Sequence, residues 1–182
     1  MTEWRNERYS ALLSAAEQRE FVPFVHELIA TAFATIRPLF LSGATVSTKS
    51  DASPVTLADR NAEAAMRRLI EQRYPEHAIV GEEHGVKDGR HYRWVLDPID
   101  GTRAFITNCF LFGTLIALER WEHDSYRPVL GVIGHPVAGV ALIGHLHDGD
   151  HQGNHQHQAH ATRGEHRTRR AVPGLGLVGH RR

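Results

Sequence analysis

The apolar residues of the first 75 positions recur at helical spacing. This pattern predicts helices over three segments: 5–20, 22–42 and Thr56 to Tyr74. Pro23 suits the first turn of the second helix, and Pro38 predicts that this helix kinks or ends early. The third helix is expected to bury a stripe made of Ala62, Ala65, Met66, Leu69 and Ile70.

Beyond residue 75 the pattern changes to short apolar runs bounded by turn residues, which is typical of strands. Strands are predicted at Ala78–Val80, Arg93–Leu96, Leu111–Leu118, Val129–Ile133 and Val140–Ile143. A chain of 182 residues has the length of one domain. Helices followed by several strands predict an α+β fold, with N-terminal helices packed on an antiparallel sheet.

The hydrophobic pattern stops near residue 145, and nine of the 14 histidines lie at or after His135. We therefore expect an N-terminal domain over residues 1–145 and a disordered tail rich in His, Arg and Gly over 146–182. The abrupt change favours translation out of frame as the origin of this tail. The alternative is a tail that binds transition metals through its imidazoles.

Composition excludes several classes of function. Lys plus Arg and Asp plus Glu both number 21, so no net positive charge favours nucleic acid. Cys109 is the only cysteine, which excludes an intrachain disulfide. The polar N-terminus does not resemble a signal peptide, and the apolar stretch at 28–41 is too short to span a bilayer. These features predict a cytoplasmic protein without a membrane partner.

The segment from Asp97 to Thr102 is the strongest chemical signal. It runs Asp-Pro-Ile-Asp-Gly-Thr directly after an apolar strand. Pro98 fixes one φ angle and Gly101 permits a tight turn, so Asp97 and Asp100 can face one point together with a backbone carbonyl. Such hard oxygen ligands suit Mg²⁺. The alternative is a simple turn with solvated aspartates.

Two other segments add weaker signals. Glu82 and Glu83 follow the strand at 78–80, and Glu82 would approach Asp97 if that strand neighboured the next one. Without such pairing, two adjacent glutamates are an ordinary surface pair. The segment from Lys49 to Asp59 ends in the first turn of the third helix, where a carboxylate is favoured by the helix dipole alone.

Together, the three segments resemble the inositol monophosphatase-like phosphatases in order and approximate spacing. The resemblance covers about residues 20 to 144. The run from Gly101 to Ile106 is most similar to the histidinol-phosphate phosphatase branch, as are the strands after it. The resemblance implies a Mg²⁺-dependent phosphatase that acts on a small phosphorylated metabolite.

The resemblance also implies roles for single residues. Glu82, Asp97 and the carbonyl of Ile99 would hold one Mg²⁺, and Asp97 would bridge to a second held by Asp100. Thr102 and Asp59 would orient or deprotonate the attacking water, with help from Glu82. The amides of Gly101 and Thr102 would contact the substrate phosphate, and Lys49 would give electrostatic support.

The sequence also departs from the family. Members carry a second α/β domain with a Trp-Asp motif, and no Trp-Asp dipeptide occurs here. We therefore expect a truncated chain with a weakened second metal site. Histidinol phosphate is the expected substrate. The alternatives are an inositol monophosphate, a sugar phosphate or a nucleotide 3′-phosphate, or a metal-binding fragment without turnover. The family is commonly dimeric, which implies a homodimer here.

Overall fold

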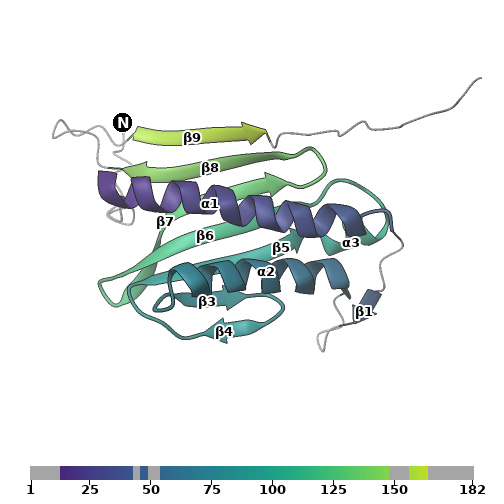
Figure 1. The fold of residues 1–182 in the computed structure, drawn as a ribbon, viewed down its shortest axis with the longest axis horizontal. Coiled ribbons are helices and arrows are strands. Elements are labelled where there is room, and N and C mark those ends of the chain that lie inside the picture. Colours follow the sequence, from purple (N-terminus) through teal and green to yellow (C-terminus); the bar gives the residue numbers. More distant parts are fainter. Residues whose placement is uncertain (1–12, 43–45, 49–53, 148–155, 164–182) are drawn as a thin grey trace, which may run out of the picture.

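The computed structural model describes residues 13–42, 46–48, 54–147 and 156–163. Two long helices lie on one face of a large sheet (Figure 1). The helical elements are α1 (Ala15–Ile36), the 3₁₀ helix η2 (Arg37–Leu39), α2 (Leu57–Arg73) and α3 (Thr102–Ile106). The α+β fold predicted from the sequence, with N-terminal helices packed on a sheet, is confirmed.

The sheet has seven strands in the order β4-β3-β5-β6-β7-β8-β9. Their bounds are β3 (Ala78–Gly81), β4 (Gly85–Lys87), β5 (Tyr92–Asp100), β6 (Gly113–Glu122), β7 (Ser125–His135), β8 (Val140–His147) and β9 (Gln156–Arg163). A separate pair joins β1 (Val46–Thr48) to β2 (Pro54–Thr56). All pairs in the large sheet are antiparallel except β3 with β5, which is parallel. The sheet predicted to be antiparallel is thus mostly antiparallel, with one parallel pair.

Helix α1 is a single element where the sequence predicted two. It starts at a capping box formed by Ser14 and Glu17, and Pro23 lies inside it. An internal proline costs about 3 kcal/mol. Each fully buried large apolar side chain contributes about 1.5–3 kcal/mol. The buried face on both sides of Pro23 outweighs its cost: Phe21, Phe24, Val25, Leu28, Ile29, Ala32, Phe33 and Ile36. The early end predicted from Pro38 is observed, since α1 stops at Ile36.

Helix α2 has almost the predicted limits, with Thr56 as its N-cap and Tyr74 as its C-cap. Its buried residues are Ala58, Asp59, Ala62, Glu63, Met66 and Ile70. Two members of this buried face, Asp59 and Glu63, are charged and were absent from the predicted apolar stripe. Both prove important to the arrangement of the candidate site.

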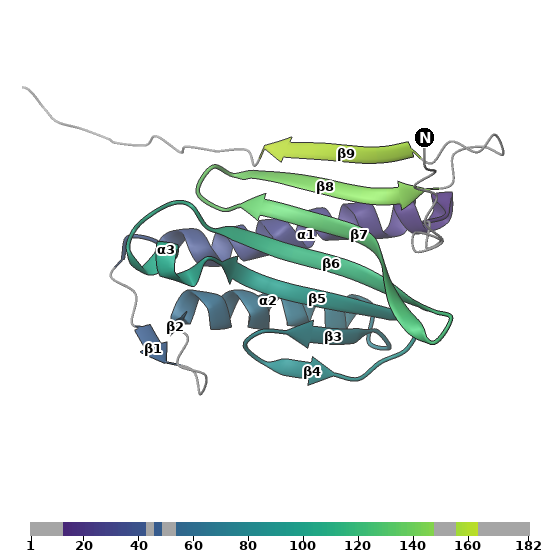
Figure 2. The same cartoon turned by 180° about the vertical axis from the view of Figure 1, so that it is seen from behind.

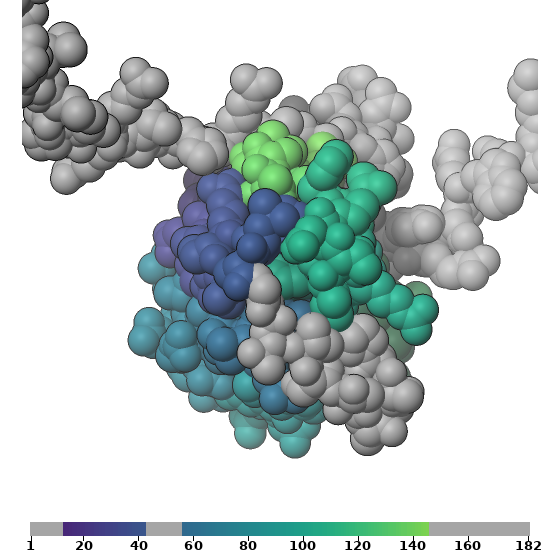
Figure 3. All heavy atoms as spheres, turned by 90° about the vertical axis from the view of Figure 1, so that its right-hand side faces the viewer, coloured from purple at the N-terminus to yellow at the C-terminus, as the bar shows by residue number. Residues whose placement is uncertain are grey.

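The core lies between the helices and the sheet. Trp94 of β5 is fully buried and packs edge-on against Phe24 of α1, with ring centroids 5.5 Å apart. At one end, Phe40 contacts Phe105 and Phe112 at 5.5 and 5.1 Å. Figure 3 views this end and shows the chain after α1, in blue, beside the segment around α3, in green. These aromatic contacts hold α3 against the end of the helical layer.

The other face of the sheet carries no helix among the described residues (Figure 2). Ile133 and Leu142 are 62% and 49% exposed there, on the adjacent strands β7 and β8. An open hollow of about 580 Å³ on this face is lined by Asp100, Gly101, Leu111, Phe112, Gly113, Leu115, Ile133, Gly134, His135, Val140, Ala141 and Leu142. Within the described part of the chain, none of the helices has the length and apolarity needed to cross a membrane.

Strand β9 differs from the expectation of a disordered tail. Residues 156–163 pair with β8 along its whole length, from Val140 opposite Arg163 to His147 opposite Gln156. The edge of β8 offers backbone donors and acceptors to any extended segment, so the pairing does not need an apolar side-chain pattern. The other tail residues lie outside the described part. The domain division at residue 145 stays a prediction.

Candidate metal and phosphate site

The turn from Asp97 to Thr102 begins with a bulge in β5. Asp97 pairs with Leu115 of β6 and Asp100 pairs with Gly113, so β5 has one extra residue between these pairs. A bulge bends its strand and changes the direction of its side chains. The Thr114 hydroxyl of β6 donates to the Pro98 carbonyl oxygen at 2.8 Å and fixes the bulged segment. The predicted turn is therefore a strand irregularity held by the neighbouring strand.

The turn then leads directly into α3. Gly101 is the N-cap of α3 and has a φ of 93° and a ψ of 40°, in the left-handed region that glycine adopts at low cost. A Cβ atom at Gly101 would also lie 3.3 Å from the Leu111 carbonyl oxygen. Thr102 is the first residue of α3, and its hydroxyl donates to the Ile99 carbonyl oxygen at 3.1 Å. Glycine at 101 thus allows the sharp reversal that brings Thr102 back over the turn.

Asp59 lies in the first turn of α2 and is 2% exposed. Its Oδ2 atom accepts the Thr56 N–H at 2.8 Å and the Thr56 hydroxyl. The Thr102 hydroxyl lies 3.4 Å from the other oxygen, Oδ1. The capping interaction therefore orients Asp59 so that its second oxygen faces Thr102.

Glu82 reaches Asp97 through the parallel pairing of β3 with β5. Gly81 lies opposite Leu96, so the next residue of each strand, Glu82 and Asp97, come together at the same sheet edge. Burial is the largest cause that raises the pKa of Asp97, and together with the negative charges of Glu82 and Asp100 and a hydrogen bond with Glu82 it brings that pKa to about 7. The sequence predicted that Glu82 would approach Asp97 only if their two strands were neighbours. β3 and β5 are neighbours in the sheet.

The donor set at this edge suits a divalent cation. Asp97 Oδ1 is buried and has no hydrogen-bond partner among the described residues. A buried carboxylate oxygen without a partner is costly, and a cation would satisfy it. The oxygens of Glu82, Asp97 and Asp100 and the Ile99 carbonyl are hard ligands of the kind that Mg²⁺ prefers. As arranged here, however, no three Asp, Glu, His or Cys side chains of the described residues form a group that could hold a metal ion.

Two sets of predicted residues are not placed by the structure. Lys49 lies outside the described residues. The side chains of the histidine-rich tail are likewise not described, although the backbone of 156–163 is. Neither the electrostatic role of Lys49 nor metal binding by the tail is therefore tested by the geometry.

Glu63 of α2 was not among the site residues predicted from the sequence. Its side chain is 0% exposed, and its carboxylate accepts the backbone N–H groups of Glu83 and His84. A signal was present, because position 63 follows Ala62 and precedes Met66 on the face predicted to be buried. A carboxylate on a buried helical stripe requires polar partners, and here those partners belong to the turn that carries Glu82.

A family model described as the inositol monophosphatase family matches residues 17–175. This chain belongs to the inositol monophosphatase family, whose members are metal-dependent phosphatases. The match extends to residue 175, within the histidine-rich tail, and the origin of that tail stays a prediction.

Several relatives with curated names are phosphatases. The chloroplastic bifunctional phosphatase IMPL2 of Arabidopsis thaliana is 42% identical over 135 residues, which cover 72% of this chain and 38% of that protein. A histidinol-phosphatase of Streptomyces coelicolor is 39% identical over 94 residues, which cover 52% of this chain and 35% of the relative. The corresponding enzyme of Chlorobaculum parvum is 45% identical over 97 residues, with the same coverage. The chain thus spans little more than a third of these relatives.

Solved structures of inositol monophosphatase relatives share the fold of this chain. An inositol monophosphatase from Zymomonas mobilis is 47% identical, with a TM-score of 0.58, over 73% of this chain and 49% of that one. The extragenic suppressor protein suhB from Bartonella henselae is 25% identical, with a TM-score of 0.63, over 69% and 49% of the two chains. The chain therefore corresponds to about half of each solved relative.

Proposed function

We propose that this chain hydrolyses phosphomonoesters with Mg²⁺ as its cofactor, and that histidinol phosphate is its substrate. The observation that carries the proposal is the buried, unpartnered Oδ1 of Asp97, which lies among carboxylates at the turn that also carries Thr102. A site of this kind needs a cation, and a phosphoryl group is the usual companion of protein-bound Mg²⁺.

In this proposal, Glu82, Asp97 and the Ile99 carbonyl hold the first Mg²⁺, while Asp97 and Asp100 hold a second. When bound, the two metals lower the pKa of a water molecule and neutralise charge on the leaving oxygen. The bulge in β5 places Asp97 and Asp100 in one turn, where Asp97 would contribute to both ions and Asp100 to the second.

The protein's own residues would handle the proton. The single proton of the Thr102 hydroxyl is shared between Asp59 Oδ1 at 3.4 Å and the Ile99 carbonyl oxygen at 3.1 Å, and the hydroxyl oxygen can accept a hydrogen bond from the attacking water. As the water oxygen bonds to phosphorus and the ester P–O bond breaks, one proton of the water would pass through Thr102 to Asp59, with Glu82 as the alternative acceptor. The leaving oxygen would take up a proton and depart as the alcohol. Asp59 is suited to this role because Thr56 holds its other oxygen in place.

The phosphate group would contact the backbone amides of Gly101 and Thr102, where the chain enters α3. Lys49 would add a positive charge nearby. The hollow on the open sheet face begins at Asp100 and Gly101, so the organic part of the substrate could extend into it.

The choice of histidinol phosphate rests on two relatives named histidinol-phosphatase and on the run from Gly101 to Ile106. With this substrate the products are histidinol and phosphate, and the reaction is a step of histidine biosynthesis in the cytoplasm. A homodimer is part of the same proposal, by analogy with the family.

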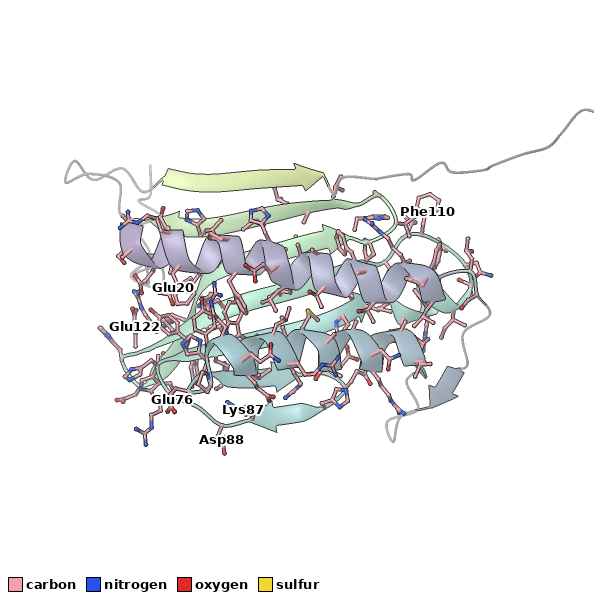
Figure 4. The ribbon with its side chains drawn as sticks, in the orientation of Figure 1. Glu20, Glu76, Lys87, Asp88, Phe110 and Glu122 are labelled. Atoms are coloured by element: carbon pink, nitrogen blue, oxygen red, sulfur yellow. The ribbon has the colours of Figure 1, made fainter. Side chains whose placement is uncertain are left out.

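The test is phosphate release by the purified 182-residue chain with Mg²⁺ and histidinol phosphate, compared with inositol monophosphate. We expect release from histidinol phosphate that EDTA stops and that Asp97→Asn reduces at least 100-fold. Asp88→Asn is the matched control, because Asp88 is an exposed aspartate just after β4 (Figure 4). Release that is unaffected by Asp97→Asn would contradict the proposal.

A second candidate is metal binding without turnover. It is motivated by the share of the named phosphatases that this chain covers, which is 38% of the first and 35% of the second. Mn²⁺ binding, measured by electron paramagnetic resonance, together with phosphate release separates the two candidates. Binding that Asp97→Asn abolishes, with no phosphate release from any phosphomonoester, would establish the second candidate in place of the first.

A further inference from the structure

Glu63 is a fully buried carboxylate outside the family motifs described above. It lies in the second turn of α2 and is 0% exposed. Burying an ionised carboxylate costs several kcal/mol unless hydrogen bonds and an opposite charge compensate. The partners of Glu63 therefore indicate what its burial achieves.

Two of those partners are backbone amides of the turn between β3 and β4, and the third is an arginine of α2. Glu63 Oε2 accepts the Glu83 N–H at 2.6 Å, and Oε1 accepts the His84 N–H at 3.0 Å. Arg67, one helical turn along α2, donates from Nε to Oε1 at 2.7 Å. Both carboxylate oxygens are thus engaged with two consecutive backbone amides of the turn and with one cation.

Two further contacts join α2 to the same turn. The Arg67 guanidinium also donates to the Gly85 carbonyl oxygen. The His84 ring nitrogen Nε2 lies 3.0 Å from the Arg60 carbonyl oxygen. Arg60, Glu63 and Arg67 are spaced by three and four positions and so lie on one side of the helix. This stripe of α2 contacts Glu83, His84 and Gly85, which lead from the turn into β4.

Gly81 shows how closely Glu63 approaches the strand before the turn. A Cβ atom built on Gly81 would lie 1.9 Å from Glu63 Oε1, far inside any allowed contact. It would also lie 2.8 Å from an Arg67 nitrogen. The carboxylate of Glu63 therefore occupies the space that any other residue at position 81 would need.

Glu82 lies between these two fixed points. The residue before Glu82, Gly81, lies against the Glu63 carboxylate. The residue after it, Glu83, donates its backbone N–H to the same carboxylate. The side chain of Glu82 meets Asp97, with Asp100 also nearby, and these like charges repel one another. A turn held only by its own hydrogen bonds would relax away from this repulsion.

We propose that Glu63 is the positioning residue that holds Glu82 against Asp97, and that it thereby sets the affinity of the site for its divalent cation. This inference rests on the proposed function, in which Glu82 and Asp97 share a cation. Glu63 itself touches neither the substrate nor the reacting atoms. It acts through the backbone of the turn, as outer residues do that orient metal ligands.

The test is Mn²⁺ binding to the full chain by electron paramagnetic resonance, with Glu63→Gln as the variant. Glutamine keeps the size of the side chain, but its NH₂ group must face one of the two backbone N–H groups and cannot accept from it. We expect Mn²⁺ affinity to fall about 10–100-fold, the usual effect of losing an outer residue at a metal site. Unchanged affinity would overturn the proposal.

Ile70→Ala is the matched control for lost stability. Ile70 is fully buried on the same helix, about two turns beyond Glu63, and its apolar side chain cannot donate or accept a hydrogen bond at the turn. Its loss should lower the melting temperature while leaving Mn²⁺ affinity within about two-fold of that of the wild type. If both variants lose affinity in proportion to their loss of stability, Glu63 has only a structural role.

Gly81→Ala provides an independent variant. Alone, it should weaken Mn²⁺ binding, because the new methyl group displaces the Glu63 carboxylate. In a Glu63→Ala background the carboxylate is gone and only the flexible end of Arg67 must move, so adding Gly81→Ala should cause little further loss. Additive losses in the double variant would contradict the proposed contact between the two positions.

Hydrogen exchange separates failure of this inference from failure of the proposed function. If the wild type binds Mn²⁺ but releases no phosphate, hydrolysis fails and the Mn²⁺ comparison still decides on Glu63. If the wild type binds no Mn²⁺, the protection of the Glu83 and His84 amide protons from hydrogen exchange decides whether Glu63 holds the turn. We expect Glu63→Gln to lose their protection at least 10-fold more than Ile70→Ala does, and equal loss would overturn the positioning role.

Discussion

The Thr102 hydroxyl donates toward Oδ1 of Asp59 at 3.4 Å and joins the first residue of α3 to the first turn of α2. Thr102→Val keeps the shape of the side chain and removes this donor. We expect phosphate release to fall about 10²–10⁴-fold, the range for loss of a positioned acid–base group. The free energy of unfolding should fall by only about 1 kcal/mol.

Thr107→Val is the control for this prediction. Thr107 follows α3 directly and is exposed, and its hydroxyl donates only to the backbone carbonyls of Arg103 and Ala104. Initial rates of phosphate release with histidinol phosphate provide the comparison. Equal rates for the two valine variants would remove Thr102 from the proposed proton path.

Glu17 connects the start of α1 to the sheet, since it accepts hydrogen bonds from Tyr92 of β5 and Arg120 of β6. Burial alone would raise its pKa, but hydrogen bonds from Ser14, Tyr92 and Arg120 outweigh burial and lower the pKa to about 2. The folded state thus favours the carboxylate. The resulting stability is fully present above pH 4.5 and is lost as the pH falls toward 2.

Glu17→Gln should therefore lower the free energy of unfolding at pH 7 by about 1–2 kcal/mol after allowance for solvent screening. The difference from wild type should shrink between pH 4.5 and 2. Urea titrations at several pH values measure it. Glu20→Gln, an exposed change on the same helix (Figure 4), is the control, and an equal effect at that position would argue against the network.

His77 is a half-buried base beside the core. The Trp94 indole N–H donates to His77 Nδ1 at 3.2 Å, so this nitrogen must carry a lone pair. Burial lowers the pKa of His77 to about 4, with further effects from Lys87 and His91. Because the folded pKa lies below the ordinary 6.5, the unfolded chain binds the proton more readily. Stability is then present above pH 6.5 and is lost as the pH falls toward 4.

His77→Phe should lower stability at pH 7, because the Trp94 N–H loses its acceptor, and should also flatten the pH dependence between 6.5 and 4. We expect the change in the free energy of unfolding between pH 6.5 and 4 to become smaller by about 1–2 kcal/mol. His123→Asn, at an exposed turn with a positive φ, is the control for removing a histidine. An unchanged slope in His77→Phe would show that His77 does not titrate in this range.

The open face of the sheet should tolerate charge. Ile133 and Leu142 are exposed there, so replacing both with lysine should change the free energy of unfolding by no more than about 0.5 kcal/mol each. The binding of an apolar fluorescent dye such as ANS should fall at the same time. Leu130→Lys on the buried side of β7 is the contrasting variant and should unfold the chain. Strong destabilisation by the outer pair would show that another surface covers this face.

Local sequence patterns determined much of this protein. The capped stripe of α2, five apolar strands and the Asp97 to Thr102 turn follow from side-chain period and turn chemistry, which act over a few residues. The three motif segments also identified the family before any geometry was known. Their meeting at one edge required only that two predicted strands be neighbours.

Other features were decided by the tertiary structure. Pro23 marks a helix start by local rules, yet packing of the apolar face on both sides of it keeps α1 continuous. The parallel pairing of β3 with β5 and the pairing of β9 with β8 depend on backbone groups far apart in the sequence. Glu63 resembles any helical glutamate until the fold brings the turn after Gly81 onto it. Sequence patterns record local preferences, whereas burial and partners exist only once distant segments have packed together.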